Sequence, residues 1–173
     1  MPPGPCARHP EIRPIRAGEA SALRELRLRA LADAPAAFAS SADAESRLPD
    51  DHWLKLVDDA IAGDRTTITV ALDGARWVGM AAGHWFERDR GIVQLWGLWV
   101  DPAARGRGTA SALVGGVRGW AAASGATFLR LGVIEPADTL RRFYERLGFV
   151  ALDDPVWMRF DPTRQALFMA RPV

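Results

Sequence analysis

The chain has one cysteine, one tyrosine and almost no excess of charge of either sign. Its 173 residues carry a formal net charge of +1 at pH 7, which gives no sign of nucleic acid or an anionic membrane as a partner. The single cysteine, Cys6, excludes an internal disulfide and suits a reducing compartment. No apolar run approaches the length of a membrane span or resembles the core of a signal peptide. We therefore expect a cytoplasmic protein that binds neither nucleic acid nor a membrane.

The composition is that of one globular domain. Hydrophobic residues make up 49% and charged residues 25% of the chain, both ordinary values for a folded domain of this length. A Pro-rich start indicates a flexible N-terminal tail over residues 1–10, which includes Cys6. Because no repeat or linker divides the remainder, residues 11–173 are expected to form a single domain.

Hydrophobic periodicity predicts alternating strands and helices. The predicted strands are 11–16, 66–72, 76–87, 92–100, 128–133, 157–160 and 166–171. The predicted helices are 18–33, 50–63, one from 108 through 120, and one that ends before Gly148. This order predicts an α/β fold with a mixed sheet and helices on both faces.

The segment from Leu95 to Ala110 is the most informative part of the chain. It predicts an apolar strand, a turn that contains proline, a loop rich in Gly and Arg, and a helix that begins near Gly108. The first N–H groups of a helix have no partner within it, and the helix dipole adds positive charge there. Gly106 and Gly108 lack the Cβ that would keep a bulky anion from the backbone. The loop therefore predicts a ligand that carries a pyrophosphate.

Two nucleotide-binding motifs do not fit this loop. A Walker loop requires Gly-Lys-Ser or Gly-Lys-Thr, whereas Gly108 is followed by Thr109 and Ala110. A dinucleotide fingerprint requires a third glycine at the position that Ser111 occupies.

The spacing Arg/Gln-x-x-Gly-x-Gly/Ala does fit, with Arg105, Gly108 and Ala110 in its fixed positions. Here the chain resembles the GNAT superfamily of N-acetyltransferases, whose motif binds the pyrophosphate of acetyl-coenzyme A. A second segment, from Phe143 through Tyr144 to Gly148-Phe149, is similar to the tyrosine-bearing helix of that family, closed by Gly-Phe. Gly148 also suits the left-handed position that follows a helix.

The resemblance implies a fold and a reaction. The fold is a mixed, mostly antiparallel central sheet with helices on both faces, in which the fourth strand (92–100) splays from the fifth (128–133) and leaves a slot for pantetheine. The reaction is direct transfer of an acetyl group from acetyl-coenzyme A, as cosubstrate, to a primary amine of a small molecule or peptide. Both substrates are bound together, and no metal is involved.

The resemblance also assigns roles to residues. The backbone of Leu98, Trp99 and Val100 would bind pantetheine, and an N–H near Leu98 would stabilise the oxyanion of the thioester. Tyr144 would contact the cofactor and act as general acid toward the departing thiolate. Its alternative interpretation is a tyrosine of the core. The pyrophosphate would be bound by Arg105, Gly106, Arg107, Gly108, Thr109 and Ala110.

The general base has no clear candidate. Many relatives have a glutamate on the fourth strand where this chain has Gln94, which cannot accept a proton. The asparagine that often precedes the tyrosine helix is also replaced, by the run from Glu135 to Asp138. Substitutes that the sequence offers are Glu87, Asp89, Glu45, Asp43 and, through water, His84. Neutralising a lysine-like amine at pH 7 costs about 4.6 kcal/mol, but an α-amino group costs only about 1 kcal/mol. We therefore expect a preference for amines of low pKa.

Two other functions remain open at this point. The chain could be an acyl-coenzyme A sensor without catalysis, which Gln94 favours and Tyr144 disfavours. It could instead be a structural dimerisation domain of the same fold. The family often dimerises, so a homodimer is compatible with either function.

Overall fold

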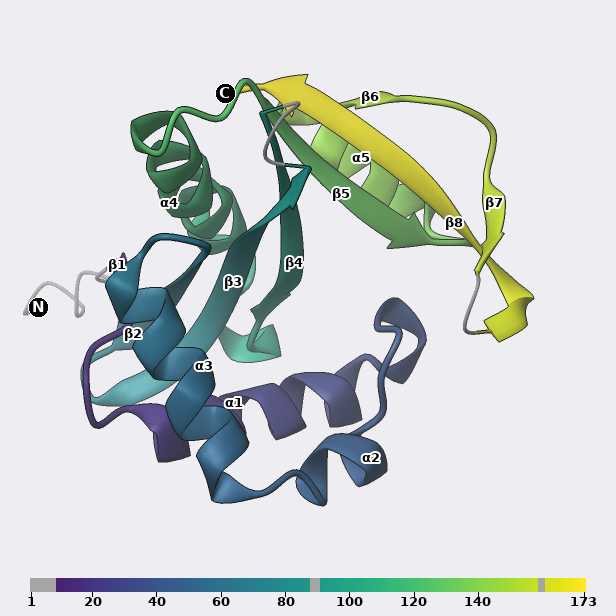
Figure 1. Ribbon diagram of the computed structural model, residues 1–173. Helices are drawn as coiled ribbons and strands as arrows, with labels where there is room; N and C mark the ends of the chain where they lie inside the picture. Colours follow the sequence, from purple (N-terminus) through teal and green to yellow (C-terminus); the bar gives the residue numbers. More distant parts are fainter. Residues whose placement is uncertain (1–8, 88–90, 159–160) are drawn as a thin grey trace, which may run out of the picture.

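The strands form one mixed sheet in the computed structural model, which describes residues 9–87, 91–158 and 161–173. Most of the predicted tail, Cys6 and Asp89 lie outside the described residues. The sheet order is β1-β2-β3-β4-β5-β8-β6, with β7 beside β8, and only β4 and β5 pair in parallel (Figure 1). The strands are β1 (Glu11–Pro14), β2 (Thr66–Asp73), β3 (Arg76–Glu87), β4 (Ile92–Val100), β5 (Phe128–Ile134), β6 (Val150–Ala151), β7 (Val156–Met158) and β8 (Asp161–Pro172).

Helices cover both faces of this sheet. They are α1 (Ala20–Asp33), α2 (Ala42–Ser46), α3 (Asp50–Ala62), α4 (Thr109–Ala123) and α5 (Asp138–Arg146), with short 3-10 turns η1 (Pro35–Ala37) and η3 (Pro102–Ala104). Leu23 of α1 and Trp53 of α3 belong to one buried cluster, whereas Leu113 of α4 and Tyr144 of α5 belong to a second. These two layers, with the mostly antiparallel sheet between them, confirm the predicted fold class.

The ends of the helices follow local chemistry. Pro35 stands directly after Ala34, the residue that closes α1, and the residue before a proline disfavours helical geometry. Gly63 ends α3 in the left-handed region at φ +72°, and Gly148 follows α5 at φ +85°. None of the helices in the described part of the chain is long and apolar enough to cross a membrane.

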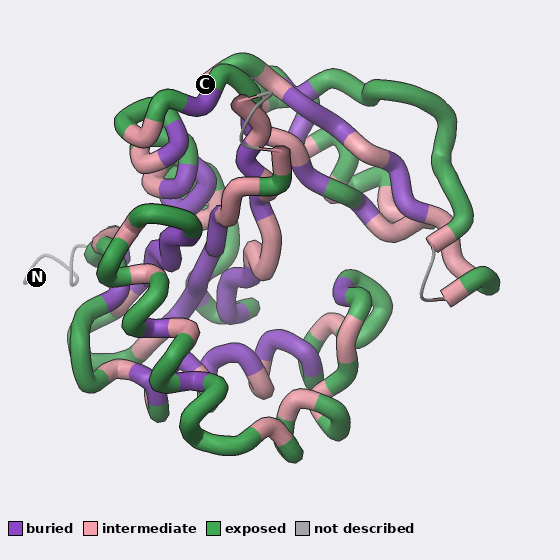
Figure 2. Tube along the Cα trace, in the orientation of Figure 1, coloured by how far each residue is buried: buried purple, intermediate pink, exposed green. Residues whose placement is uncertain are grey.

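The predicted elements differ from the observed ones mainly where the chain is short of periodic signal. The region 35–49, in which the sequence predicts no helix or strand, contains the five-residue helix α2, which Ser41 caps by accepting the N–H of Ala44 at 3.2 Å. β8 begins at Asp161, five residues before the predicted start at 166. Its first five residues are exposed or half-buried (Figure 2), so they carry little of the apolar alternation on which the prediction depended.

A bulge in β4 changes the direction of its side chains. Met80 of β3 is opposite Trp99, but Ala82 is opposite Trp96, so two residues of β4 face the single residue Ala81. One of the two is Gly97, at φ +67°. Simple alternation would place Trp96 and Trp99 on opposite faces. The bulge instead brings both to the face that α1 covers, where they pack in the same cluster.

Beyond its first residues, β4 separates from β5. The two strands are paired only at Ile92–Phe128, Val93–Leu129 and Gln94–Arg130. β4 continues to Val100 and β5 to Ile134 without further pairing between them in the described residues. The predicted splay between the fourth and fifth strands is therefore present.

Close packing of α4 on the sheet yields a stability prediction. A Cβ at Gly116 would lie 2.8 Å from Cγ2 of Thr69, which is 4% exposed, whereas a Cβ at Gly115 would meet no atom within 4 Å. We expect Gly116→Ala to destabilise the fold by about 1–3 kcal/mol through overpacking. Gly115→Ala, one residue away in the same helix, should instead stabilise it by up to about 1 kcal/mol. Urea unfolding of both variants measures the difference, and equal effects would contradict the packing argument.

Candidate active site

The loop before α4 presents open backbone. Gly106 and Gly108 have φ values of +75° and +76°, and a Cβ at either would meet no heavy atom within 4 Å. The N–H of Ala112 donates to the carbonyl of Gly108 at 3.0 Å, so the N–H groups of the three residues between them precede the first helical bond. The loop therefore combines unpaired donors, the positive end of a 15-residue helix and room for a bulky anion.

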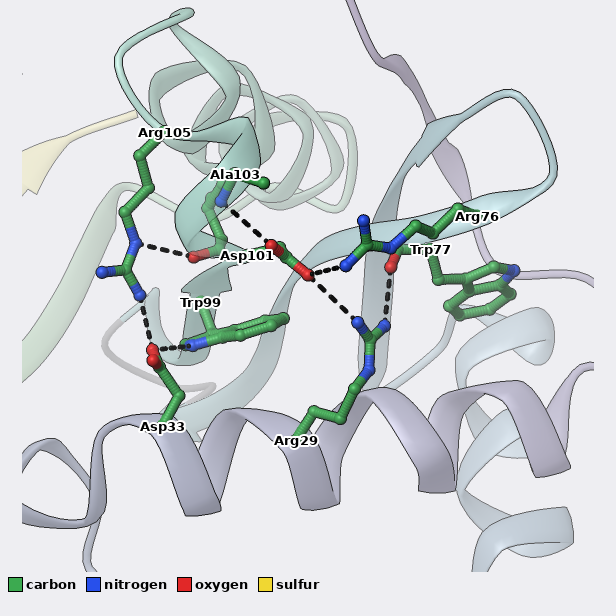
Figure 3. Close-up of polar contacts among 9 residues, drawn as sticks. Arg29, Asp33, Arg76, Trp77, Trp99, Asp101, Ala103 and Arg105 are labelled. Atoms are coloured by element: carbon green, nitrogen blue, oxygen red, sulfur yellow. Dashed lines mark hydrogen bonds and ion pairs between the residues drawn. The ribbon is translucent and has the colours of Figure 1, made fainter.

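A buried carboxylate fixes the start of this loop. Asp101, 6% exposed, accepts the N–H of Ala103 at 3.0 Å and pairs with Arg76 at 2.7 Å and Arg29 at 3.1 Å (Figure 3). Arg29 also donates to the carbonyl of Trp77 at 2.7 Å. Asp101 thus joins α1, β3 and the turn after β4 in one network.

A second carboxylate holds the arginine of the motif. Nη2 of Arg105 lies 2.5 Å from Oδ2 of Asp33, and its Nε donates to the carbonyl of Val100 at 2.8 Å. The same oxygen of Asp33 accepts the indole N–H of Trp99 at 2.9 Å (Figure 3). The bond from Trp99, followed by that from Arg105, lowers the pKa of Asp33. The guanidinium of Arg105 is therefore anchored to α1 and β4, while about half of its side chain remains exposed.

Arg107 is held less firmly. Its Nη1 is 4.0 Å from Oδ2 of Asp73, and the Arg107 side chain is 40% exposed. An exposed ion pair of this length contributes little to stability, so this guanidinium is free to turn toward an anion at the loop.

The free edge of β4 exposes alternate backbone groups. Asp101 N donates to Val78 O at 2.8 Å, and in an antiparallel pair the bonding residues alternate. The backbone N–H and carbonyl of Trp99 therefore point toward Met80 of β3, whereas the N–H and carbonyl of Val100 point away from β3. The carbonyl of Val100 accepts Nε of Arg105 there, which agrees with this direction.

Tyr144 lies on the other face of the sheet from α1. It is 6% exposed and packs edge-on against Phe143 and Phe149, at centroid distances of 5.1 Å and 5.5 Å. Burial raises the pKa of the Tyr144 hydroxyl, so the group keeps its proton throughout the neutral range.

A cleft of about 590 Å³ lies beside the unpaired part of β4. Two walls of the cleft are tied together by Arg164 of β8, which donates to the carbonyls of Phe38, at 3.1 Å, and Ala36. The described residues that line the cleft are Arg27, residues 37–40, residues 94–97, Gly132, Ile134, Val156, Trp157, Met158, Ala166 and Phe168.

Most of the predicted bases do not lie free in this cleft. Glu45 forms two hydrogen bonds with Arg27, at 2.8 Å and 2.9 Å, and its side chain is 14% exposed. Asp43 pairs with Arg47 on the surface. Glu87 lies at the end of β3, where its charge acts on Arg130. Among the described residues, no group of three or more His, Cys, Asp or Glu could hold a metal ion.

Gln94 and His84, one of the candidate bases, lie opposite each other at the start of the splay. Gln94 lines the cleft, with its Oε1 3.5 Å from Nη1 of Arg130. His84 is directly opposite Gln94 in the β3–β4 register, which places the two side chains on one face of the sheet. Burial lowers the pKa of His84, so the imidazole is neutral at pH 7.

Sequence reasoning missed the residues that support this site. Asp33, Asp101, Arg27 and Arg164 bond to partners far away in the sequence, and no local pattern marks such pairs. Only Asp101 had a local signal, because Asp followed by Pro at the end of a strand favours a turn.

The comparison with known families identifies the class of protein. The sequence pattern of the Acetyltransferase (GNAT) family matches residues 27–149, a range that contains the loop, the splay and Tyr144. The chain therefore belongs to the GNAT acetyltransferase family, which confirms the family and the class of enzyme expected from the sequence. No protein of curated function matches the chain by sequence.

Solved structures share the fold over nearly the whole chain. The yncA acetyltransferase of Salmonella typhimurium, solved with acetyl-CoA, is 19% identical with a TM-score of 0.76, and the match covers 95% of this chain and 94% of that one. A phosphinothricin acetyltransferase of Sinorhizobium meliloti, also with acetyl-CoA, is 17% identical with a TM-score of 0.76, covering 96% and 89%. Spermidine N-acetyltransferase of Vibrio cholerae, with CoA and spermine, is 14% identical with a TM-score of 0.74, covering 95% of each. At these identities the likeness shows the fold.

The network at Asp101 generates a prediction. Asp101→Asn removes the negative charge that Arg29 and Arg76 share. We expect the free energy of unfolding to fall by about 2–3 kcal/mol. This is less than the full cost of breaking a buried pair, because the arginines are partly exposed. Asp59→Asn, which breaks an exposed pair with Lys55, should change stability by no more than about 0.5 kcal/mol. Thermal unfolding of both variants measures this. Similar losses would show that Asp101 does not anchor the loop.

Proposed function

We propose that the protein is an N-acetyltransferase that moves an acetyl group from acetyl-coenzyme A directly to a primary amine of a small molecule or peptide. The observation that carries the proposal is the open loop at Gly106 and Gly108, beside the part of the β4 edge that has no strand partner in the described residues. A structural domain without a ligand would have no reason to keep these donors, this space and this edge together. The family match supports the same donor.

The residues present fit acetyl-coenzyme A. The backbone N–H groups of residues 106–110, with the side chains of Arg107 and Thr109, would bind the pyrophosphate. Arg105 would act mainly through the exposed edge of its guanidinium, which Asp33 and Val100 hold in place, because its backbone N–H donates to the carbonyl of Pro102 at 3.3 Å. Leu98 and Val100 would bind the pantetheine through the free edge of β4, with Trp99 between them.

The protein would accelerate the reaction mainly by holding the amine and the thioester together. The acetyl thioester supplies the acyl group and a thiolate that can leave. As the C–N bond forms and the C–S bond breaks, the backbone N–H of Leu98 would stabilise negative charge on the carbonyl oxygen. The amine loses one proton to a base, and Tyr144 would give one proton to the sulfur. The raised pKa of Tyr144 ensures that this proton is present at neutral pH.

We propose His84, acting through water, as the base. It is neutral at pH 7 and lies opposite Gln94 at the start of the splay. Glu45 is a weaker candidate because both of its oxygens bond to Arg27. Glu87 is weaker because it lies opposite Ile92, at the end of β4 away from its unpaired part, and its charge acts on Arg130. Charged residues that line the hollow beside His84 are Lys55, Asp59, Asp64 and Arg65.

The donor site is tested by calorimetric titration with acetyl-coenzyme A. Gly108→Asp places a carboxylate where the pyrophosphate would bind, and we expect affinity to fall at least about 100-fold. Gly125→Asp is a matched control at the other end of α4, with φ +84° and equally open space. The control should bind as tightly as the unchanged protein. Equal binding by both variants, or none by the unchanged protein, would refute the donor site.

Release of free thiol with an amine panel then separates a transferase from an acyl-coenzyme A sensor. A protein that binds the donor tightly but releases no thiol with any amine would be the sensor, and the catalytic part of the proposal would fail.

The pH dependence of kcat/KM tests His84. With an α-amine acceptor, protonation of the amine gives a slope of one in log(kcat/KM) below about pH 7.7. Burial lowers the pKa of His84 below its usual value of about 6.5. Protonation of His84 should therefore increase the slope of log(kcat/KM) from one to two at a pH below about 6.5. In His84→Gln the slope should stay at one, because only protonation of the amine remains, and kcat/KM at pH 8 should be reduced about 100-fold. His52→Gln, an exposed histidine of α3, should keep both slopes. A slope of two in His84→Gln would exclude this base.

A further inference from the structure

The wall of the cleft beside β4 is aromatic. Its described lining includes the rings of Phe38, Trp96, Trp157 and Phe168, and Trp157 is 64% exposed at the rim. None of the described residues that line the cleft is acidic. A polyamine would find no carboxylate in this described lining, whereas an aromatic or large apolar group would bury its surface there.

Arg27 is the one charged side chain in that described lining, and one of its nitrogens has no partner. Nε and Nη2 bond to Glu45 at 2.9 Å and 2.8 Å, and the guanidinium carbon lies 4.8 Å from the ring centre of Phe38. The side chain is 9% exposed, and Nη1 is enclosed without a hydrogen-bond partner among the described residues. A Cβ at Gly97 would lie 3.9 Å from Nη1. The unsatisfied donor is therefore beside the bulge of β4, where the cleft meets the unpaired strand edge.

An enclosed donor without a partner is a natural site for an oxygen atom of a ligand. Because Glu45 already balances the charge of Arg27, the site calls for a hydrogen-bond acceptor and does not require a full negative charge. Small side-chain rotations of the kind that accompany binding would admit it. An amine next to a carbonyl group carries such an oxygen. The pKa of such an α-amine, about 7.7–8.0, also suits a cleft without a carboxylate base.

We infer that the acceptor is the α-amine of an aromatic or large apolar residue, with the neighbouring carbonyl oxygen bound by Nη1 of Arg27. The inference rests on the proposed acetyl transfer and names its substrate class. Amino-acid amides and peptide N-termini share this chemistry. Trp96 and Trp157 would contact the side chain, and Arg27 would be a specificity-determining residue that positions the amine.

The test compares phenylalaninamide with 2-phenylethylamine, which has the same ring and no carbonyl. Arg27→Lys keeps a positive charge beside Glu45 but replaces the guanidinium with a single ammonium nitrogen, so the donor Nη1 is lost and the ratio of kcat/KM for the two amines should fall about tenfold. Any part of the ratio that comes from amine pKa should survive the substitution. Arg24→Lys is the matched control, because Arg24 lies on α1 and bonds to the carbonyl of Ser46 outside the cleft. It should leave the ratio unchanged.

Two further measurements extend the test: the first does not use an Arg27 variant, and the second does not require turnover. Trp157→Ala, at an exposed position, should raise KM for phenylalaninamide about two- to tenfold and leave glycinamide unaffected. Calorimetric titration with N-acetylphenylalaninamide should show binding that weakens about tenfold in Arg27→Lys and not in Arg24→Lys. A dipeptide that begins with phenylalanine, compared with phenylalaninamide, distinguishes the peptide from the small-molecule source, and either preference supports the inference.

A preference for spermidine over phenylalaninamide, or an unchanged amine ratio in a folded Arg27→Lys protein, would overturn the inference. If no amine releases coenzyme A, the proposed function fails separately. The calorimetric difference between the Arg27 and Arg24 variants would still decide whether this acceptor site exists.

Discussion

The site depends on the way β4 is hydrogen-bonded along its two edges. One edge follows β3 to the end of the strand, whereas the other meets β5 at only three residue pairs, which end at Gln94 and Arg130. Backbone groups beyond that point must find other partners, since unpaired polar groups are costly to bury. One of them, the carbonyl of Val100, is satisfied by Arg105. The rest of this edge is unpaired with β5 in the described residues, and the cleft and the loop at Gly106 and Gly108 lie at the two ends of this opening.

Two carboxylates from different elements keep the opening in place. Asp33, at the end of α1, holds Trp99 and Arg105, while Asp101 holds Arg29, Arg76 and the turn that leads to α4. Both carboxylates connect α1 to the end of β4 (Figure 3). Since α1 also supplies Arg27 to the cleft, one helix positions both the loop before α4 and one wall of the cleft. Rigid support of this kind is what binding two substrates in line requires.

Much of the fold could be predicted because its elements have strong local patterns. The spans of β3 and β4 were predicted to the residue, and the ends of α3 and α5 were marked by Gly63 and Gly148, which adopt positive φ there. The direction of Trp99 was not predictable by alternation. A single glycine such as Gly97 in an apolar strand indicates a bulge only in general terms, and the register with β3 decides which side chains change face.

The sequence by itself determined the family, because the open loop before α4 and the helix that carries Tyr144 are short contiguous patterns whose chemistry comes from neighbouring residues. The tertiary structure alone decided which residues line the cleft beside β4. Glu45 resembled a base in the sequence, but an ion pair with Arg27, 18 residues earlier, occupies its oxygens. His84 and Gln94 became neighbours only through the register of two strands. The side chains that line the cleft are distant in sequence, and the contacts between them exist only once the sheet and α1 have packed.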